Sequence, residues 1–196
     1  DYLGGLPVKF TKMHGAGNDY VYVDGRGLER DWSAFSIIVS DRHRGIGSDG
    51  LIVALPSDQA DLRMEMFNAD GSVGKMCGNG IRCLVAFALE KGILAHDSNH
   101  VVVDTLSGYK TVSPVWINGA IKSAAVNMGA PIFNPDDVPV VAPQLDQVMN
   151  YPIEVNGQTF SINCVSMGNP HAVAFIEDPV DEMPLHEIGP QIEHHP

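Results

Sequence analysis

The sequence has few cysteines, few basic residues and no long apolar run. Three cysteines in 196 residues are too few for a disulfide framework, which favours a reducing compartment and therefore the cytoplasm. Lys and Arg total 12 against 24 Asp and Glu, so nucleic acid is a poor partner for this acidic chain. The longest uninterrupted apolar stretch, residues 84–89, is far shorter than the roughly 20 residues of a membrane-spanning helix, so no membrane partner is expected. The hydrophobic content of 44% is nevertheless sufficient for a globular core.

Glycine and proline separate many short segments that have the pattern of β-strands. Along residues 62–67, apolar side chains alternate in the way typical of a half-buried strand. The Asn156–Gly157 pair predicts a two-residue hairpin turn between strands at 153–155 and 159–165. Further strands are predicted at 20–23, 51–55, 101–105, 109–112 and 172–176.

Two segments carry helical signals. Asp31 can cap a helix that runs to about Ser40. A second helix is predicted from about Asn79 to Lys91, ending at Gly92, because glycine is common just past a helix C-terminus. Apolar residues surround nearly the whole circumference of this second helix, which predicts that it is buried. Among many short strands, such a helix favours a sheet wrapped around one central helix.

Prolines interrupt any regular pattern between residues 126 and 143, which predicts a domain boundary there. The part before this boundary looks complete. The part after it is short and has no second helix of comparable strength, so alone it would bury little apolar surface. We therefore expect a first domain over residues 7–126 and a partial second domain over residues 127–196.

Residues 68–82 form the densest cluster of candidate functional residues, and Cys77 lies immediately before the predicted buried helix. Gly78, Asn79 and Gly80 would form the first helical turn, where backbone N–H groups have no helical partner. Such a helix start stabilises a thiolate and can also hold a carboxylate. An arbitrary cysteine is more often a small buried residue, but the Gly-Asn-Gly flank favours a functional thiol here.

The other two cysteines have the surroundings of core residues. Cys83 lies in the middle of the predicted helix, and Cys164 lies in a predicted strand without a following glycine. The spacing of Cys77 and Cys83 does not fit a C-x2–4-C zinc motif, and no matching histidine pair follows. No metal is therefore expected.

Three loops add polar candidates. Asn18, in a Gly-rich loop between two predicted strands, can present its amide to a polar ligand, although a plain turn explains this loop equally well. The loop at 41–50 carries charges of both signs among glycines and is interpreted mainly as a solvated turn. In the third loop, Pro170 holds Asn169 extended, and His171 begins a strand. A lone histidine is more often structural, but beside an Asn-Pro turn His171 is a candidate for orienting a substrate.

Five segments in order resemble the diaminopimelate epimerase family over almost the whole chain. They are FTKMHGAGND (10–19), DRHRGIGSDG (41–50), NADGS (68–72), MCGNGIRC (76–83) and SMGNPH (166–171). Each segment is modest alone, but the ordered set is highly specific. The wider fold group also includes proline racemases and phenazine-pathway isomerases. The long opening motif and the Cys-Gly-Asn-Gly form favour the epimerase over the former, and the presence of Cys77 argues against the latter.

The resemblance implies a cofactor-free enzyme that interconverts LL- and meso-diaminopimelate, a small amino-acid substrate of lysine and cell-wall precursor synthesis. It implies an α+β fold of two similar domains, each a curved, mostly antiparallel sheet wrapped around a central helix, with the second domain incomplete here. By resemblance, Cys77 is one of two catalytic thiols and His171 supports the site. The implied substrate-binding residues are Asn18, Asn68, Gly78, Asn79 and Asn169. A homodimer stays open as the assembly.

The chain also departs from the family pattern. Residues 1–196 contain neither a second Cys-Gly-(Thr/Ser)-Gly motif nor the Glu-Arg pair that precedes it, and Cys164 does not match. Some relatives have a ligand-contacting glutamine at the position of Gly50, so this contact is absent or replaced here. We therefore expect the chain to supply one thiol and to be inactive alone. The alternatives are an inactive remnant that binds an amino acid or a partner, a redox-sensing thiol at Cys77, and a racemase for another amino acid.

Overall fold

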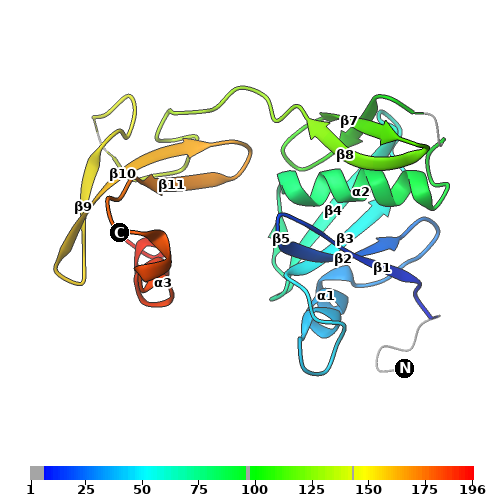
Figure 1. Cartoon of the computed structure of the whole chain (residues 1–196), viewed down its shortest axis with the longest axis horizontal. Helices are drawn as coiled ribbons and strands as arrows, with labels where there is room; N and C mark the ends of the chain where they lie inside the picture. Colours follow the sequence, from blue (N-terminus) through cyan, green and yellow to red (C-terminus); the bar gives the residue numbers. More distant parts are fainter. Residues whose placement is uncertain (1–6, 96–97, 143) are drawn as a thin grey trace. The chain divides into compact units, whose positions relative to one another are not determined.

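The computed structural model describes residues 7–95, 98–142 and 144–196, and the chain forms two compact units (Figure 1). The first unit extends to Met128, and the second begins at Gly129. Each unit has its own sheet and its own apolar core. Within the described residues, no helix is both long enough and apolar enough to cross a membrane.

Over its described residues, the first unit combines one mixed sheet with two α-helices. Its strands are β1 (Phe10–Gly15), β2 (Asn18–Asp24), β3 (Gly50–Leu55), β4 (Leu62–Asn68), β5 (Val73–Gly74), β6 (Val101–Asp104), β7 (Lys110–Ile117) and β8 (Ala120–Val126). Its helices are α1 (Trp32–Ser40) and α2 (Gly78–Glu90). The strand order is β1-β2-β3-β4-β6-β7-β8, with β5 paired to β4. The β2–β3 and β4–β6 pairs are parallel and the other pairs are antiparallel, so the predicted mostly antiparallel sheet is confirmed.

Helix α2 contacts strands at both ends of the sheet, which therefore curls around the helix (Figure 1). It packs against β1 and β2 on one side and against β7 and β8 on the other. Its Ile81, Leu84 and Val85 are fully buried in the main core. The prediction of a central buried helix is confirmed, although Cys83 and Ala86 on its remaining side are only partly buried.

Helix α1 covers the opposite face of the sheet. Val21 and Val23 of β2 belong to the same apolar cluster as Trp32 of α1. Tyr22, between these two valines, and Ile52 of β3 belong to the cluster around α2. Successive side chains of a strand point to opposite faces, so each central strand supplies apolar residues to both helices.

The residues that the sequence predicted at the start of α1, at the end of α2 and in the second-unit hairpin occupy these positions in the structure. The Asp31 carboxylate accepts a hydrogen bond of 3.0 Å from the Ala34 N–H and so caps α1. Gly92, just past α2, has a φ of 68°, in the left-handed region that glycine adopts readily. The predicted hairpin turn at Asn156 and Gly157 has φ values of 53° and 75°, as a type I′ turn requires.

The second unit has a three-stranded antiparallel sheet in the order β11-β10-β9. Its elements are β9 (Tyr151–Val155), β10 (Gln158–Ser166), β11 (Pro170–Ala174), a short 3-10 helix (Val180–Glu182) and α3 (Leu185–Glu193). Phe160, Ile162 and Cys164 of β10 form its core together with Ile188 of α3. No helix was predicted at α3, and β11 begins two residues before the predicted strand because Pro170 pairs with Ser166.

The main difference from prediction lies at the end of the first unit. The predicted strand at 109–112 continues to Ile117, and an Asn118–Gly119 turn with positive φ values joins it to β8. Strand β6 pairs with β7 only as far as Val112. Pro114 lies beyond this pairing, so its missing N–H interrupts no bond to β6.

Candidate functional site

Cys77 begins helix α2 as its N-cap residue. Its backbone is extended, with φ −139° and ψ 114°, and its sulfur accepts a hydrogen bond of 3.3 Å from the Gly80 N–H. The side chain is partly exposed, whereas Met76 before it is buried. The thiol is therefore held at the positive end of a buried helix and remains accessible.

The two glycines that follow Cys77 in the first turn of α2 differ in how much space surrounds them. A Cβ on Gly80 would lie 2.5 Å from Ile52 Cδ1 and 3.3 Å from Cys77 Cβ, so this glycine allows the helix to approach β3 closely. A Cβ on Gly78 would find its nearest atom, Met128 Sδ, at 3.6 Å, an ordinary contact distance. The packing of the fold therefore requires glycine at Gly80 but not at Gly78.

Asn18 connects the start of β2 to the thiol. The Cys77 thiol donates a hydrogen bond of 3.3 Å to Asn18 Oδ1. Asn18 Nδ2 donates a hydrogen bond of 2.8 Å to Asp49 Oδ2. The predicted loop around Asn18 is a two-residue turn, Ala16–Gly17, between β1 and β2.

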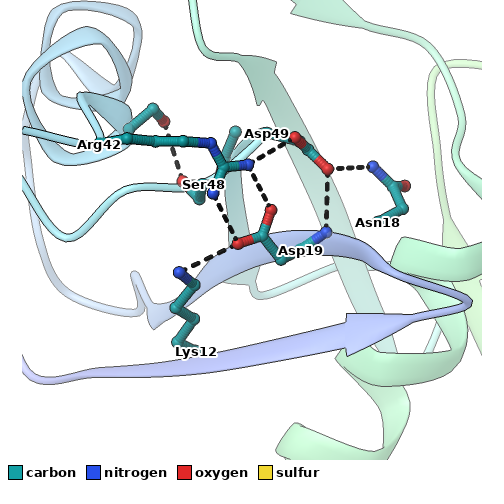
Figure 2. A network of polar contacts seen from close by, with 8 residues as sticks. Lys12, Asn18, Asp19, Arg42, Ser48 and Asp49 are labelled. Carbon is teal, nitrogen blue, oxygen red and sulfur yellow. Dashed lines mark hydrogen bonds and ion pairs between the residues drawn. The ribbon is translucent and has the colours of Figure 1, made fainter.

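Asp49 belongs to a network of ion pairs and hydrogen bonds (Figure 2). Arg42 Nη2 bridges two carboxylates, at 2.8 Å from Asp49 Oδ1 and 2.8 Å from Asp19 Oδ1. Lys12 Nζ lies 3.0 Å from Asp19 Oδ2. The hydrogen bond from Arg42, together with Lys12, holds the pKa of Asp19 far below its usual range. The loop at 41–50, interpreted mainly as a solvated turn, therefore carries an organised network.

Tyr20 lies beside the thiol and is only 5% exposed. Burial raises the pKa of Tyr20, and its interaction with Cys77 raises it further, against the opposing effect of a hydrogen bond with Asn18. The phenol is therefore neutral near neutral pH, and it contributes a polar but uncharged wall to the site.

Asn68 and Asn79 approach the same edge of the sheet from different elements. Asn68 ends β4 and pairs with Gly50, which in turn pairs with Tyr20 of β2. Its amide donates a hydrogen bond of 2.9 Å to Ser72 Oγ. In the first turn of α2, Asn79 Oδ1 accepts a hydrogen bond of 2.6 Å from Arg82.

The first turn of α2 also packs against β1. A Cβ on Gly15 would lie 3.1 Å from Asn79 Cβ. A Cβ on Gly50 would lie 2.2 Å from the Phe67 carbonyl oxygen, so the backbone here leaves no room for a side chain.

The structure thus brings four of the predicted site residues to one end of the first unit together with Cys77. They are Asn18, Asn68, Gly78 and Asn79.

Asn169 and His171 lie in the second unit, at the turn between β10 and β11. His171 is exposed, and its Nδ1 lies 2.9 Å from the Asn169 carbonyl oxygen. A carbonyl can only accept a hydrogen bond, so Nδ1 carries the hydrogen and Nε2 remains as the basic nitrogen of the neutral ring. His171 also lines an apolar groove of about 670 Å³ in this unit, next to Cys164.

The other two cysteines differ from Cys77 in their surroundings. Cys164 is 3% exposed in the core of the second unit, and burial raises its pKa. Cys83 packs partly buried against the main core, where burial raises its pKa against the opposing effect of a hydrogen bond with Tyr22. Neither thiol begins a helix.

The sequence analysis assigned no role to Asp49, Arg42 or Tyr20, although they complete the surroundings of Asn18 and Cys77. Charges of both signs in a Gly-rich loop were the available signal for Asp49 and Arg42. Their partners are set by the parallel pairing of β2 with β3, which no local pattern reveals. Tyr20 carried only the signal of a strand residue.

Comparison with known proteins gives consistent results over this chain. A sequence model described as "Diaminopimelate epimerase" matches residues 10–134. Two relatives, both named "Diaminopimelate epimerase", come from Acetivibrio thermocellus and from Methanococcus maripaludis strain S2. The first is 45% identical over 190 residues, covering 96% of this chain and 66% of the relative. The second is 46% identical over 189 residues, covering 96% of this chain and 67% of the relative. The chain thus spans about two thirds of the length of these relatives.

Solved structures with low sequence identity share the fold. A probable proline racemase from Agrobacterium radiobacter K84 aligns with a TM-score of 0.66 and 14% identity, covering 93% of this chain and 53% of that one. A hydroxyproline epimerase from Agrobacterium vitis aligns with a TM-score of 0.62 and 14% identity, with the same coverage of both chains. At this identity the similarity concerns the fold alone.

Proposed function

Because this chain belongs to the diaminopimelate epimerase family, we propose that it supplies one acid/base thiol for the cofactor-independent epimerisation of LL-diaminopimelate to meso-diaminopimelate. The observation that carries the proposal is the position of Cys77, a partly exposed thiol at the N-terminus of a buried helix. We assign residues 7–126 to the first domain of the family fold and residues 127–196 to part of the second.

The chemistry requires a proton to leave one face of Cα and another to arrive on the opposite face. The Cys77 thiolate removes the first proton: the Cα–H bond breaks, its electron pair stays on the substrate, and an S–H bond forms. A second acid then protonates the opposite face. The developing negative charge extends into the substrate carboxylate, where the unpaired N–H groups at the start of α2 stabilise it.

The amides around the thiol provide the recognition of the substrate. We assign substrate binding to the backbone at Gly78 and to the side chains of Asn18, Asn68 and Asn79, which lie at the same end of the first unit. Gly78 supports this assignment because the protein's own packing leaves room for a Cβ there. A ligand that approaches the backbone closely explains the glycine.

In the second unit, we assign substrate binding to Asn169 and support of the site to His171. The hydrogen at Nδ1 of His171 leaves Nε2 free to accept a proton or a hydrogen bond. Asn169 follows Gly168, whose φ of 101° turns the chain between β10 and β11.

The free state of all three cysteines supports a reducing compartment such as the cytoplasm.

We expect this chain to bind the substrate without epimerising it, because the second face needs a second acid/base group. Cys77 at the start of α2 serves the first face, whereas Cys83 lies within α2 and Cys164 is buried in the core of the second unit. Measurable epimerisation by the purified chain, followed by optical rotation, would contradict this expectation.

Titration calorimetry with meso-diaminopimelate tests the proposal. The chain should bind diaminopimelate in preference to proline. A Gly78→Ala variant should fold normally and lose binding, because the added methyl group occupies the space that the substrate carboxylate needs. Gly189→Ala is the matched control, since a Cβ at this helical glycine of α3 meets nothing within 4 Å. Failure of the parent chain to bind diaminopimelate, or a preference for proline, would overturn the assignment.

A further inference from the structure

A chain of hydrogen bonds runs from Arg42 to the thiol. Arg42 Nη2 donates to Asp49 Oδ1 at 2.8 Å, and Asn18 Nδ2 donates to Asp49 Oδ2 at 2.8 Å. The Cys77 thiol then donates to Asn18 Oδ1 at 3.3 Å. Asp49 is thus linked to the Cys77 sulfur through the Asn18 amide.

Asp49 determines which end of the Asn18 amide faces the sulfur. A carboxylate can only accept hydrogen bonds, so Asn18 must turn its NH2 group toward Asp49. The carbonyl oxygen of the amide then faces the sulfur. A carbonyl oxygen can accept a hydrogen bond from a thiol but cannot donate one to a thiolate. This orientation therefore favours the protonated form of Cys77.

The Asp49 carboxylate is itself fixed by the backbone. Its Oδ2 accepts a second hydrogen bond, of 3.0 Å, from the Asp19 N–H. The Asp49 N–H in turn donates to the Asp19 carbonyl oxygen at 2.8 Å. Figure 2 shows Asp49 between Asp19 and Asn18, with Arg42 on its other oxygen. The side chain is 41% exposed yet has partners on both oxygens.

We infer that Asp49 is a positioning residue that orients the Asn18 amide and thereby holds Cys77 in its thiol form until substrate binds. The inference rests on the proposed function, in which the same sulfur alternates between proton donor and proton acceptor. When Cys77 acts as a base, its thiolate is stabilised by hydrogen-bond donors, and the Asn18 carbonyl oxygen cannot be one of them. The Gly80 N–H already supplies one such donor.

Other titratable groups near the sulfur are neutral in the range where this effect acts. Tyr20 and Tyr22 interact with Cys77 from β2, and Cys83 interacts with it from α2. Burial raises the pKa of each of these three groups. The Arg82 guanidinium of α2 donates a hydrogen bond of 2.6 Å to Asn79 Oδ1. The charged groups that face Asp49 are Arg42 and, through it, Asp19.

The test is the pH profile of Cys77 alkylation in the purified chain. Iodoacetamide reacts with thiolates, and peptide mass spectrometry separates Cys77 from Cys83 and Cys164. In Asp49→Ala, the Asn18 amide is free to turn its NH2 group toward the sulfur. We expect the midpoint of the profile to move down by about one pH unit, a roughly tenfold faster reaction at a fixed pH below the midpoint.

The same substitution in an Asn18→Ala background separates positioning from charge. If Asp49 acts through Asn18, its removal has no further effect once Asn18 is absent. If its negative charge acts directly on the sulfur, the shift persists. Asp24→Ala is the matched control: it removes an ion-paired carboxylate at the far end of β2, about 20 Å along the strand from Asn18.

The outcomes are distinct. A downward shift in Asp49→Ala that disappears in the Asn18→Ala background supports the inference. No shift, or an equal shift in both backgrounds, overturns it and leaves the proposed function intact. A parent chain whose Cys77 is unreactive at every pH overturns both. Should Asp49→Ala fail to fold, Asp49→Leu keeps a side chain of similar shape without a hydrogen-bond acceptor, and the same criteria apply to it.

Discussion

The close contact between α2 and β3 at Gly80 makes the stability of the first unit sensitive to a single methyl group. In Gly80→Ala, the new Cβ would lie 2.5 Å from Ile52 Cδ1 and 3.3 Å from Cys77 Cβ. Ile52 is 0% exposed, so its terminal carbon cannot move without displacing packed neighbours. Either the helix start shifts outward or Ile52 leaves its preferred rotamer.

The size of the effect follows from two opposing terms. Overpacking of a well-packed core costs about 1–3 kcal/mol. Alanine is better than glycine inside a helix by up to about 1 kcal/mol. We therefore expect a net loss of about 1–2 kcal/mol, which lowers the Tm of a unit of this size by about 3–10 °C. Gly78→Ala, where the Cβ meets its nearest atom at 3.6 Å, should leave the Tm nearly unchanged.

Tryptophan fluorescence measures the stability of the first unit, where Gly80 lies. The two tryptophans, Trp32 and Trp116, both lie in the first unit, so urea unfolding followed by their emission reports on that unit alone. Thermal unfolding by the same signal gives the Tm. Equal stability of Gly80→Ala and Gly78→Ala would refute the described packing of α2 on β3.

Two further predictions concern stability. Asp19→Asn should destabilise the chain at pH 7, and this difference should shrink as the pH falls below about 4. The paired carboxylate has a lowered pKa, so its contribution is complete above the unfolded value of about 3.9 and decreases below it. Urea unfolding at pH 7 and pH 3 measures the difference, and a constant difference contradicts the ion pairing. Gly157→Ala, at a φ of 75°, should cost about 1 kcal/mol by circular dichroism melting, whereas Gly189→Ala in α3 should be neutral or stabilising. Equal effects of both substitutions would argue against the type I′ turn.

Local sequence signals predicted the elements whose ends are marked by capping or turn residues. The apolar circumference of α2, its start after Cys77 and its end before Gly92 were all visible in the sequence. The Asn-Gly pair at 156–157 likewise predicted the β9–β10 hairpin. A second Asn-Gly pair, Asn118–Gly119, carried the same signal and was overlooked, which is why β8 was missed.

Long-range pairing set the features that local patterns could not predict. Asp49 meets Asn18 because β3 pairs in parallel with β2, with Gly50 opposite Tyr20. The two segments lie about thirty residues apart in the sequence, and neither contains a pattern that specifies the other. The position of Cys77 was predictable because its neighbours are local, whereas the orientation of its Asn18 partner depends on the tertiary structure.

Protection of Cys77 by ligand tests the central claim most directly. The purified chain is treated with iodoacetamide near neutral pH, with and without meso-diaminopimelate, and each cysteine is quantified by peptide mass spectrometry. A partly exposed thiol at a helix N-terminus, beside the substrate-binding amides, should react faster than Cys83 and Cys164 and should be protected by diaminopimelate. Faster modification of Cys83 or Cys164, or equal reaction of Cys77 with and without diaminopimelate, would contradict the account.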